Sequence, residues 1–102
     1  MRDRDLFAGL IRLHLLHHAS EEPIFGLGMI EELGRHGYHM SAGTLYPILH
    51  SLESRGYLRS TIRQTPDARR RRVYRITPAG RRALAEAKLK VRELFGELFE
   101  HA

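Results

Sequence analysis

Arginine side chains are concentrated in one stretch of this chain of 102 residues. Ten arginines and a single acid, Asp67, lie between Arg55 and Arg82, so this segment carries a formal charge of 10 − 1 = +9 and leaves 5 − 9 = −4 for the rest. Arginine donates paired hydrogen bonds to phosphates and base edges through its planar guanidinium group. This separation of charge predicts binding to a polyanion, with a solvated basic face as the alternative reading.

A run of four arginines stands out within the basic stretch. Successive side chains of a strand point to opposite faces, so we expect two of the four to face one way and two the other. Contacts to DNA phosphates are the main role expected, with one arginine entering the minor groove. The arginines assigned to DNA are Arg69, Arg70, Arg71 and Arg72, together with Arg63 on the partner strand.

Polar residues mark the beginning of a helix that is expected to start at Ser41 and to be ended by Gly56. Ser41 is expected to be its N-cap, with a hydroxyl that accepts from the N–H of Gly43 or Thr44. Pro47 cannot donate to the carbonyl of Gly43, so we expect the first turn to be distorted or to restart near Tyr46. Apolar residues at i, i+3, i+4 and i+7 predict the side that faces the core: Leu45, Ile48, Leu49 and Leu52.

The opposite side of this helix has the composition of a DNA-reading surface. The first turn of a recognition helix meets base edges in the major groove, and a glycine there lets the backbone approach a ligand closely. The residues assigned to DNA are Ser41, Gly43, Thr44, Tyr46 and His50. The alternatives are plain helix capping for Ser41 and Thr44 and a core position for Tyr46.

Three histidines, His14, His17 and His18, have the i, i+3, i+4 spacing that can hold a metal ion on one helix. The set lacks a nearby carboxylate or thiolate on the same helix, so we expect no metal site and no cofactor. A second hypothesis is that these histidines line a dimer seam and make it sensitive to pH.

Apolar periodicity and turn residues divide the chain into the elements that position these side chains. Leu27, Ile30 and Leu33 are expected to face inward from the second helix, and Leu58 and Ile62 from the first strand. The fold class is therefore mostly α with a small β-hairpin. The expected elements are helices over residues 4–19, 25–35 and 78–100, a third helix that begins at Ser41 and is ended by Gly56, strands over 57–64 and 70–76, and a turn over 65–68, with Thr77 as the N-cap of the last helix.

The first and last helices carry more apolar surface than a domain of this size can cover. Apolar residues of the last helix follow a heptad-like spacing, and those of the first helix form two stripes. We therefore expect a homodimer, in which residues 1–77 form the DNA-binding domain and residues 78–102 form a dimerisation helix of the same compact unit. The residues assigned to the interface are Phe7, Leu10, Ile11, Leu84, Ala87, Val91, Leu94, Phe95 and Leu98.

Several function classes are disfavoured by what the sequence lacks. The chain has no cysteine, which excludes disulfides and thiolate metal sites. No apolar run approaches the roughly 20 residues that a membrane span needs, and the N-terminus lacks a secretory profile, so the cytoplasm is the expected location. No nucleophile elbow, phosphate-binding glycine loop or zinc-hydrolase motif is present, so we expect no enzymatic activity.

The motifs described above resemble those of the PadR family of bacterial transcriptional regulators. The similar segments are Ser41-x-Gly43-Thr44-Leu45-Tyr46-Pro47-x-Leu49-x-x-Leu52-Glu53, Gly56-Tyr57-Leu58, Arg71-Arg72-x-Tyr74-x-Ile76-Thr77 and Gly80. The resemblance covers essentially the whole chain and is to the short members of the family. It implies a homodimeric winged helix-turn-helix protein, usually a repressor, with the third helix in the major groove and the hairpin wing along the adjacent backbone or minor groove.

Family members are often released from DNA by small aromatic or hydrophobic compounds, so the resemblance also implies a small hydrophobic effector. The chain departs from the family's pattern at the wing tip and in its lack of tryptophan. Ala68 stands at the turn of the wing where the family often has glycine, so we expect the wing tip to differ in shape. The chain has no tryptophan, which excludes the drug-stacking mode of some short relatives.

The sequence therefore predicts a dimeric, sequence-specific DNA-binding regulator of transcription, with repression as the expected outcome. Its partners are double-stranded DNA carrying an inverted repeat, a second copy of the chain and a small hydrophobic effector, with no membrane. Two alternatives remain: a winged-helix module that binds protein, and a ligand sensor that acts mainly through a cavity in the dimer.

Overall fold

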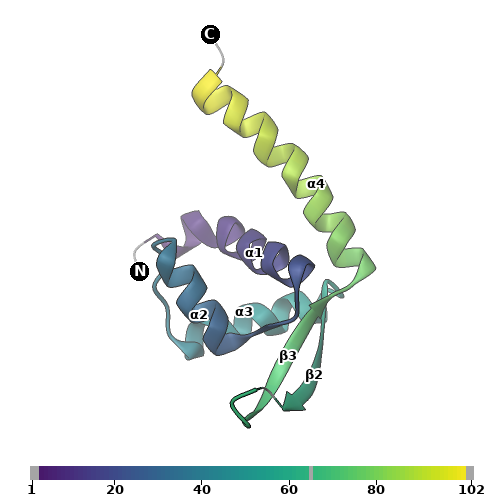
Figure 1. Ribbon diagram of the computed structural model, residues 1–102. Helices are drawn as coiled ribbons and strands as arrows, with labels where there is room; N and C mark the ends of the chain where they lie inside the picture. Colours follow the sequence, from purple (N-terminus) through teal and green to yellow (C-terminus); the bar gives the residue numbers. More distant parts are fainter. Residues whose placement is uncertain (1–2, 65, 101–102) are drawn as a thin grey trace.

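Three helices and a small sheet form the body of the molecule, from which a fourth helix extends (Figure 1). The computed structural model describes residues 3–64 and 66–100. The predicted fold class, mostly helical with a small sheet, is confirmed. In chain order, the elements are α1 (Arg4–Glu21), β1 (Ile24–Phe25), α2 (Gly26–Arg35), α3 (Ala42–Ser54), β2 (Leu58–Gln64), β3 (Arg70–Ile76), α4 (Pro78–Phe95) and a π-helical segment, η1 (Gly96–Glu100).

The hydrophobic core lies where α1, α2 and α3 pack against the base of the sheet. The predicted inner stripe of α3 is confirmed, because its four apolar residues are all buried. Burial of such side chains contributes about 1.5–3 kcal/mol each, which fixes the rotation of α3 about its axis. The buried cluster consists of Ile11, Leu15, Leu16, Ala19, Ile24, Leu33, Leu45, Ile48, Leu49, Leu52, Leu58, Tyr74 and Leu84.

The sheet is antiparallel with the strand order β1-β3-β2. Leu58 pairs with Ile76 at the base of the hairpin, and Gln64 pairs with Arg70 at its outer end. The two-residue strand β1 was not predicted, because a segment so short shows no periodicity and its pairing with β3 is long-range. The inward placement of Ile62 is wrong: this side chain is 46% exposed, since the outer half of the hairpin extends beyond the core.

Helix α2 begins at Gly26, one residue after the expected start, and ends at Arg35 as predicted. Leu33 is fully buried, whereas Leu27 is 44% exposed, so the prediction that Leu27 faces inward is wrong. Leu27 lies in the first turn of α2, where the 3.6-residue period places it away from Leu33.

Helix α3 corrects two local predictions. Ser41 is its N-cap, but the hydroxyl makes no capping hydrogen bond; the carbonyl of Ser41 instead accepts from the N–H groups of Thr44 and Leu45. Pro47 lies inside one continuous helix rather than at a restart. Its missing donor falls in the early part of the helix, where an uninterrupted core stripe holds both flanking turns in place.

Helix α4 begins as predicted. The Thr77 hydroxyl accepts a hydrogen bond from the N–H of Gly80 at 3.0 Å, and Pro78 occupies the first helical position. A Cβ at Gly80 would overlap the carbonyl oxygen of Tyr57, so only glycine lets α4 lie this close to the loop before β2. Beyond Leu84 the helix leaves the body (Figure 1).

The predicted turn between the strands includes Thr65, which lies outside the described residues. Within that turn, Ala68 has a φ of 66°. This left-handed conformation is the one that glycine adopts without strain, so Ala68 follows a glycine-type backbone despite its side chain. None of the helices in the described ranges combines the length and apolar character that a membrane span requires.

Candidate nucleic-acid interface

Helix α3 presents its polar side to solvent. Because the buried stripe fixes the rotation of the helix, the residues assigned to DNA from the sequence fall on or near the outer side. Ser41, Gly43, Tyr46 and His50 are exposed, and Thr44 is half-buried. The helix therefore offers hydroxyl, imidazole and bare backbone groups on one accessible surface.

A shallow cleft of about 470 Å³ lies between α3 and the hairpin. This cleft brings together side chains from the two parts of the chain that the sequence assigned to DNA. It places Arg72 of the hairpin on the same face as Tyr46 and His50 of α3. The residues that line it are Tyr46, His50, Glu53, Ser60, Arg72 and Tyr74.

Glu53 connects the last turn of α3 to β2. Its carboxylate accepts hydrogen bonds from the Ser60 N–H at 2.9 Å and from the Ser60 hydroxyl at 2.8 Å. Arg72 in turn donates to the Ser60 hydroxyl oxygen at 3.0 Å. Burial favours the neutral acid, but the hydrogen bonds from Ser60 and the charges of Arg72 and His50 hold the pKa of Glu53 below its ordinary value. An ionised Glu53 thus fixes the hairpin beside α3.

Arg71 faces away from α3 and is held by its own chain. Its guanidinium lies over the Phe25 ring, 4.7 Å from the centroid, and donates to the Asp67 carboxylate at 2.8 Å. Only 16% of its side chain is exposed. The predicted alternation along the strand is therefore confirmed here: Arg71 is largely buried, whereas Arg70 and Arg72 on either side of it are exposed.

The other arginines of the hairpin are exposed. Arg70 and Arg72 share one side of β3, and Arg63 pairs with Arg71 across the strands. Arg69 precedes β3 and lies 3.8 Å from Asp67, so this carboxylate offsets part of the local charge. The hairpin presents positive charge on both faces, but only the side of Arg70 and Arg72 continues onto α3.

Tyr46 packs over the beginning of α2. A Cβ at Gly26 would overlap the Tyr46 ring and its hydroxyl, so the ring lies here because Gly26 has no side chain. Tyr46 nevertheless remains 42% exposed. The side chain thus joins α2 to α3 while keeping one edge open to a ligand.

Two arginines near the N-terminus were missed by sequence reasoning. Arg4 and Arg12 of α1 line a second shallow cleft beside Gly43 and Thr44 of α3. Arg12 donates to the carbonyl of Ala8 at 3.1 Å. Only the packing of α1 across α3 brings them there, so no local pattern in the sequence signals their position.

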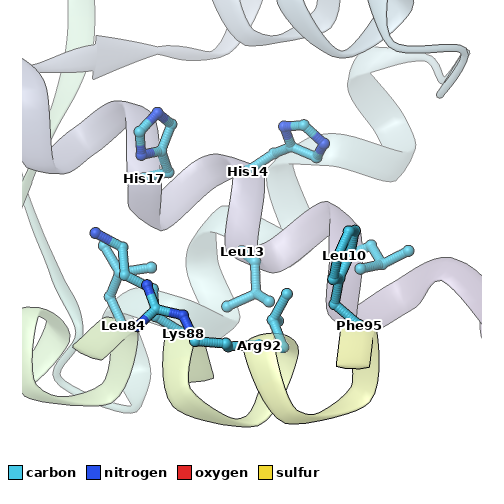
Figure 2. A pocket seen from close by; sticks show the side chains of 9 residues that line it. Leu10, Leu13, His14, His17, Leu84, Lys88, Arg92 and Phe95 are labelled. Atoms are coloured by element: carbon cyan, nitrogen blue, oxygen red, sulfur yellow. The ribbon is translucent and has the colours of Figure 1, made fainter. Parts of the chain in front are cut away.

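An apolar groove of about 530 Å³ separates α1 from α4 (Figure 2). Leu10 and Leu13 of α1 line one wall, and Val91 and Phe95 of α4 line the other. In Figure 2 the Leu13 side chain points from α1 toward α4. Lys88, Arg92, His14 and His17 also line it, so the groove combines an apolar lining with basic side chains.

The residues assigned to a dimer interface fall into two groups. Leu10 and the outer residues of α4 and η1 are exposed: Leu10 46%, Val91 44%, Leu94 48%, Phe95 48% and Leu98 61%. Ala87 is half-buried, and Phe7 is half-buried against the Tyr38 ring. Ile11 is a correction, because it is fully buried in the core of its own chain and has no surface to offer a partner. Leu84 is also buried, at the base of the groove.

The surroundings of the α1 histidines differ from expectation. The helix extends to Glu21, so a carboxylate does lie on the same helix, 3.6 Å from His17. Glu21 also lies 4.0 Å from His18, and both His14 and His18 contact side chains of α2 or its C-cap, whereas His17 has only the contact with Glu21 among these acids. The prediction that no carboxylate accompanies the set is therefore wrong.

Comparison with known proteins identifies similar sequences. Residues 15–86 match the model of the transcriptional regulator PadR-like family. The chain is 50% identical over 95 residues to the transcriptional regulator Rv3488 of Mycobacterium tuberculosis (strain ATCC 25618 / H37Rv), a match that covers 93% of this chain and 88% of that protein.

Solved structures share the fold. A PadR family transcriptional regulator from Eggerthella lenta DSM 2243 is 32% identical, with a TM-score of 0.76 over 96% of this chain and 88% of that one. A PadR-like transcriptional regulator from Bacillus cereus strain ATCC 14579 is 24% identical, with a TM-score of 0.82 over 96% of this chain and 99% of that one. These similarities confirm the predicted winged helix-turn-helix fold with a C-terminal helix.

Proposed function

The chain belongs to the PadR-like family of transcriptional regulators, and on this basis we propose that it is a homodimeric repressor that binds an inverted-repeat operator in double-stranded DNA. Regulators of this family bind DNA and are not enzymes. The observation that carries the proposal is the common face formed by Tyr46 and His50 of α3 with Arg72 of the hairpin.

In the proposed complex, α3 lies in the major groove with its first turn toward the base edges. The hairpin follows the adjacent backbone, where Arg70 and Arg72 contact phosphates from the side that continues onto α3. The ion pair and ring contact of Arg71 give it a mainly structural role. Arg4 and Arg12 add positive charge beside the beginning of α3 and extend the proposed phosphate contacts.

The dimer in this proposal forms through α4 and the neighbouring side of α1. Exposed apolar residues on α4 and η1 make a patch that water solvates unfavourably: Val91, Leu94, Phe95, Leu98 and Phe99. A second copy covers such a patch with the same surface, as two-fold symmetry requires. Two α3 helices related in this way read half-sites about 10 base pairs apart or a multiple of that.

The groove between α1 and α4 is the proposed effector site. Its apolar lining and the positive charges of Lys88 and Arg92 suit a small aromatic compound with an acidic group. An effector there contacts both helices of the proposed interface, so it changes the relative orientation of the two copies. Relief of repression follows because the half-site spacing no longer matches the distance between the α3 helices.

The proposal is tested by fluorescence anisotropy across a salt series, with a duplex from upstream of the gene and a scrambled duplex of equal length. We expect a preference of more than about a hundredfold for the upstream duplex, with a footprint that covers two half-sites. Equal, salt-sensitive affinity for both duplexes would show that this segment is not the operator. A folded dimer that binds neither duplex would contradict the proposal and favour a winged-helix module that binds protein.

A further inference from the structure

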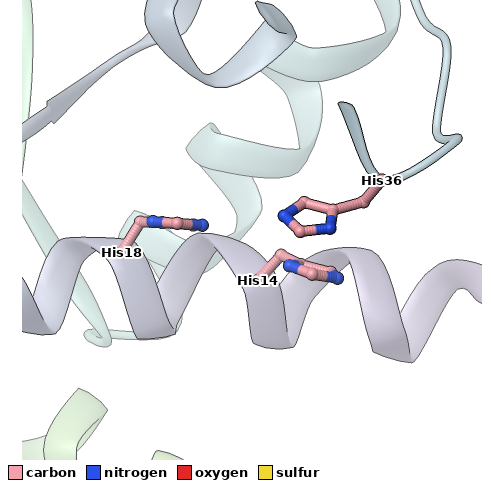
Figure 3. Close-up of side chains that lie close together, drawn as sticks. All are labelled: His14, His18 and His36. Carbon is pink, nitrogen blue, oxygen red and sulfur yellow. The ribbon is translucent and has the colours of Figure 1, made fainter. Parts of the chain in front are cut away.

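Three imidazole side chains converge between α1 and the end of α2 (Figure 3). His14 and His18 lie one turn apart on α1, and His36 is the C-cap residue of α2. One ring nitrogen of each can be chosen so that all three lie within 4.8 Å of one another. In Figure 3 the ring of His36 reaches from α2 toward α1, where His14 lies beneath it.

A carboxylate completes this group. Oε2 of Glu32 lies 3.0 Å from Nε2 of His36 and 3.7 Å from Nε2 of His18. The other carboxylate oxygen accepts a hydrogen bond from Arg35 at 2.8 Å, which orients it. Three nitrogen donors and one oxygen donor thus come from two helices that the sequence separates.

The group is partly shielded from water. The side chains of His18 and Glu32 are only 23% and 24% exposed, whereas His36 is 45% exposed. The Tyr38 ring packs against His14, with centroids 5.4 Å apart. Burial, followed by the charges of His36, His18 and His17, lowers the pKa of His14.

We propose that His14, His18 and His36, with Glu32, form a binding site for one divalent transition-metal ion of the zinc type. Imidazole nitrogen and carboxylate oxygen are ligands that zinc prefers, whereas calcium and magnesium require sites built mainly from oxygen. In a tetrahedral zinc site the donor atoms lie about 3.3 Å apart, given bonds of about 2.0–2.1 Å. On binding, the three imidazole nitrogens, now within 4.8 Å of one another, and the Glu32 oxygen would close to this spacing by rotation of their side chains.

The simpler explanation is that these histidines only pack against one another. His14 and His36 are stacked with centroids 4.6 Å apart, and Glu32 satisfies His36. Packing alone gives zinc no preferred place, whereas the proposed site predicts one ion per chain and a dependence on residues from both helices. The proposed site departs from the expectation drawn from the sequence, because His36 and Glu32 come from α2 and were not considered with the α1 set.

Zinc at this site would link α1 to α2 and so stabilise the folded chain. The test uses the full chain without an affinity tag, treated with a chelator that is then removed, and zinc chloride as the probe. Isothermal titration calorimetry gives the affinity and stoichiometry, and thermal unfolding gives the stabilisation. We expect one zinc ion per chain and a higher Tm in its presence.

His36→Ala is the main variant, because His36 is exposed at a helix end where alanine is tolerated. We expect it to weaken zinc binding by at least about 10-fold and to remove the rise in Tm. His17→Ala is the matched control, since His17 lies on the same helix but faces Glu21, and we expect it to bind as the unchanged protein does.

Glu32→Gln is a second variant, measured by the same titration. It serves if circular dichroism shows that His36→Ala disturbs the fold. It keeps the shape of the side chain but removes the charge, and we expect it also to weaken binding. The proposal is overturned if the folded, unchanged protein binds no zinc. It is equally overturned if both ligand variants bind zinc as tightly as His17→Ala does.

Discussion

Neighbouring arginines of β3 have opposite surroundings, although the sequence presents them as one run. Arg71 is packed on Phe25 and paired with Asp67, whereas Arg72 is exposed beside α3. A strand turns alternate side chains to opposite faces, so adjacent residues of one type acquire different roles. Charge counted along the sequence therefore overstates the number of arginines that DNA can reach.

This difference gives a paired test. Arg72→Ala is expected to weaken binding to specific and nonspecific duplexes alike and to reduce the slope of log K against log salt by about 1. Arg71→Ala is expected to lower the free energy of unfolding by about 1 kcal/mol, through the lost ring contact and ion pair, and to leave that slope nearly unchanged. Anisotropy across a salt series and urea unfolding measure the two effects. Equal salt slopes in both variants would contradict the assignment.

Ala68, in the turn of the hairpin, has an unfavourable backbone conformation that a substitution can relieve. Its φ of 66° is costly for a residue with a Cβ, and glycine removes that cost. Ala68→Gly should raise the free energy of unfolding by about 1 kcal/mol, measured by urea denaturation. Ala85→Gly, at an exposed position inside α4, is the control and should lower it by about 1 kcal/mol. A loss of stability in both variants would show that the turn does not require the left-handed conformation.

At the scale of the elements, Glu53 sets the position of the hairpin relative to α3. Its pKa is lower in the folded chain than in the unfolded one, so its contribution to stability is present above the unfolded pKa and is lost as pH falls through the folded pKa. Glu53→Gln should therefore lower Tm by a few degrees at pH 7, with a gap to the unchanged protein that narrows below about pH 4.5.

Thermal unfolding between pH 3 and pH 7 checks this prediction. Glu86→Gln, an exposed carboxyl on α4, is the control and should leave the curve unchanged. A Tm difference between Glu53→Gln and the unchanged protein that stays constant across this range would mean that the charge of Glu53 does not hold the hairpin.

The elements that depend on local signals were predicted well. β3 and the beginning of α4 agree with the sequence, because alternation and a Thr-Pro start are local features. Elements that depend on distant partners were not: β1 exists only because β3 pairs with it, and Ile62 is exposed because the hairpin outgrows the core. The predicted capping hydrogen bond of the Ser41 hydroxyl also failed. Capping propensity is a local signal, but the orientation of this side chain is set by how the helix packs.

The candidate sites show the same limit. The outer residues of α3 could be identified from the sequence, because the buried stripe determines the opposite side. Arg4 and Arg12 could not, because they reach α3 only through the packing of α1. The group around His36 also required the fold, since it unites residues from two helices separated by a strand.

At the scale of the whole molecule, the proposed dimer interface on α4 determines whether one or two copies meet DNA. Leu94→Glu places a charge in the exposed apolar patch, and we expect a monomer at micromolar concentration by size exclusion with light scattering. The same variant should bind a duplex with two half-sites at least about 100-fold more weakly, because the gain from joining two binding events is lost.

Leu89→Glu is the matched control for the dimer. Leu89 is 67% exposed. The 3.6-residue period places it on the opposite side of α4 from Val91, Leu94 and Phe95. We expect this variant to remain dimeric and to bind DNA normally. The arrangement proposed here is wrong if Leu89→Glu, and not Leu94→Glu, separates the copies.

The hairpin and the end of α4 lie at opposite ends of the molecule (Figure 1). Residues 55–82 carry +9, whereas residues 93–100 contain three glutamates and no cation. The chain therefore has a permanent electric dipole along its long direction. In the proposed mode of DNA binding, the field of a nearby duplex would turn the hairpin toward DNA before any contact forms. Encounters should then be productive more often than random collisions, and the rate of capture should fall steeply as added salt screens the field.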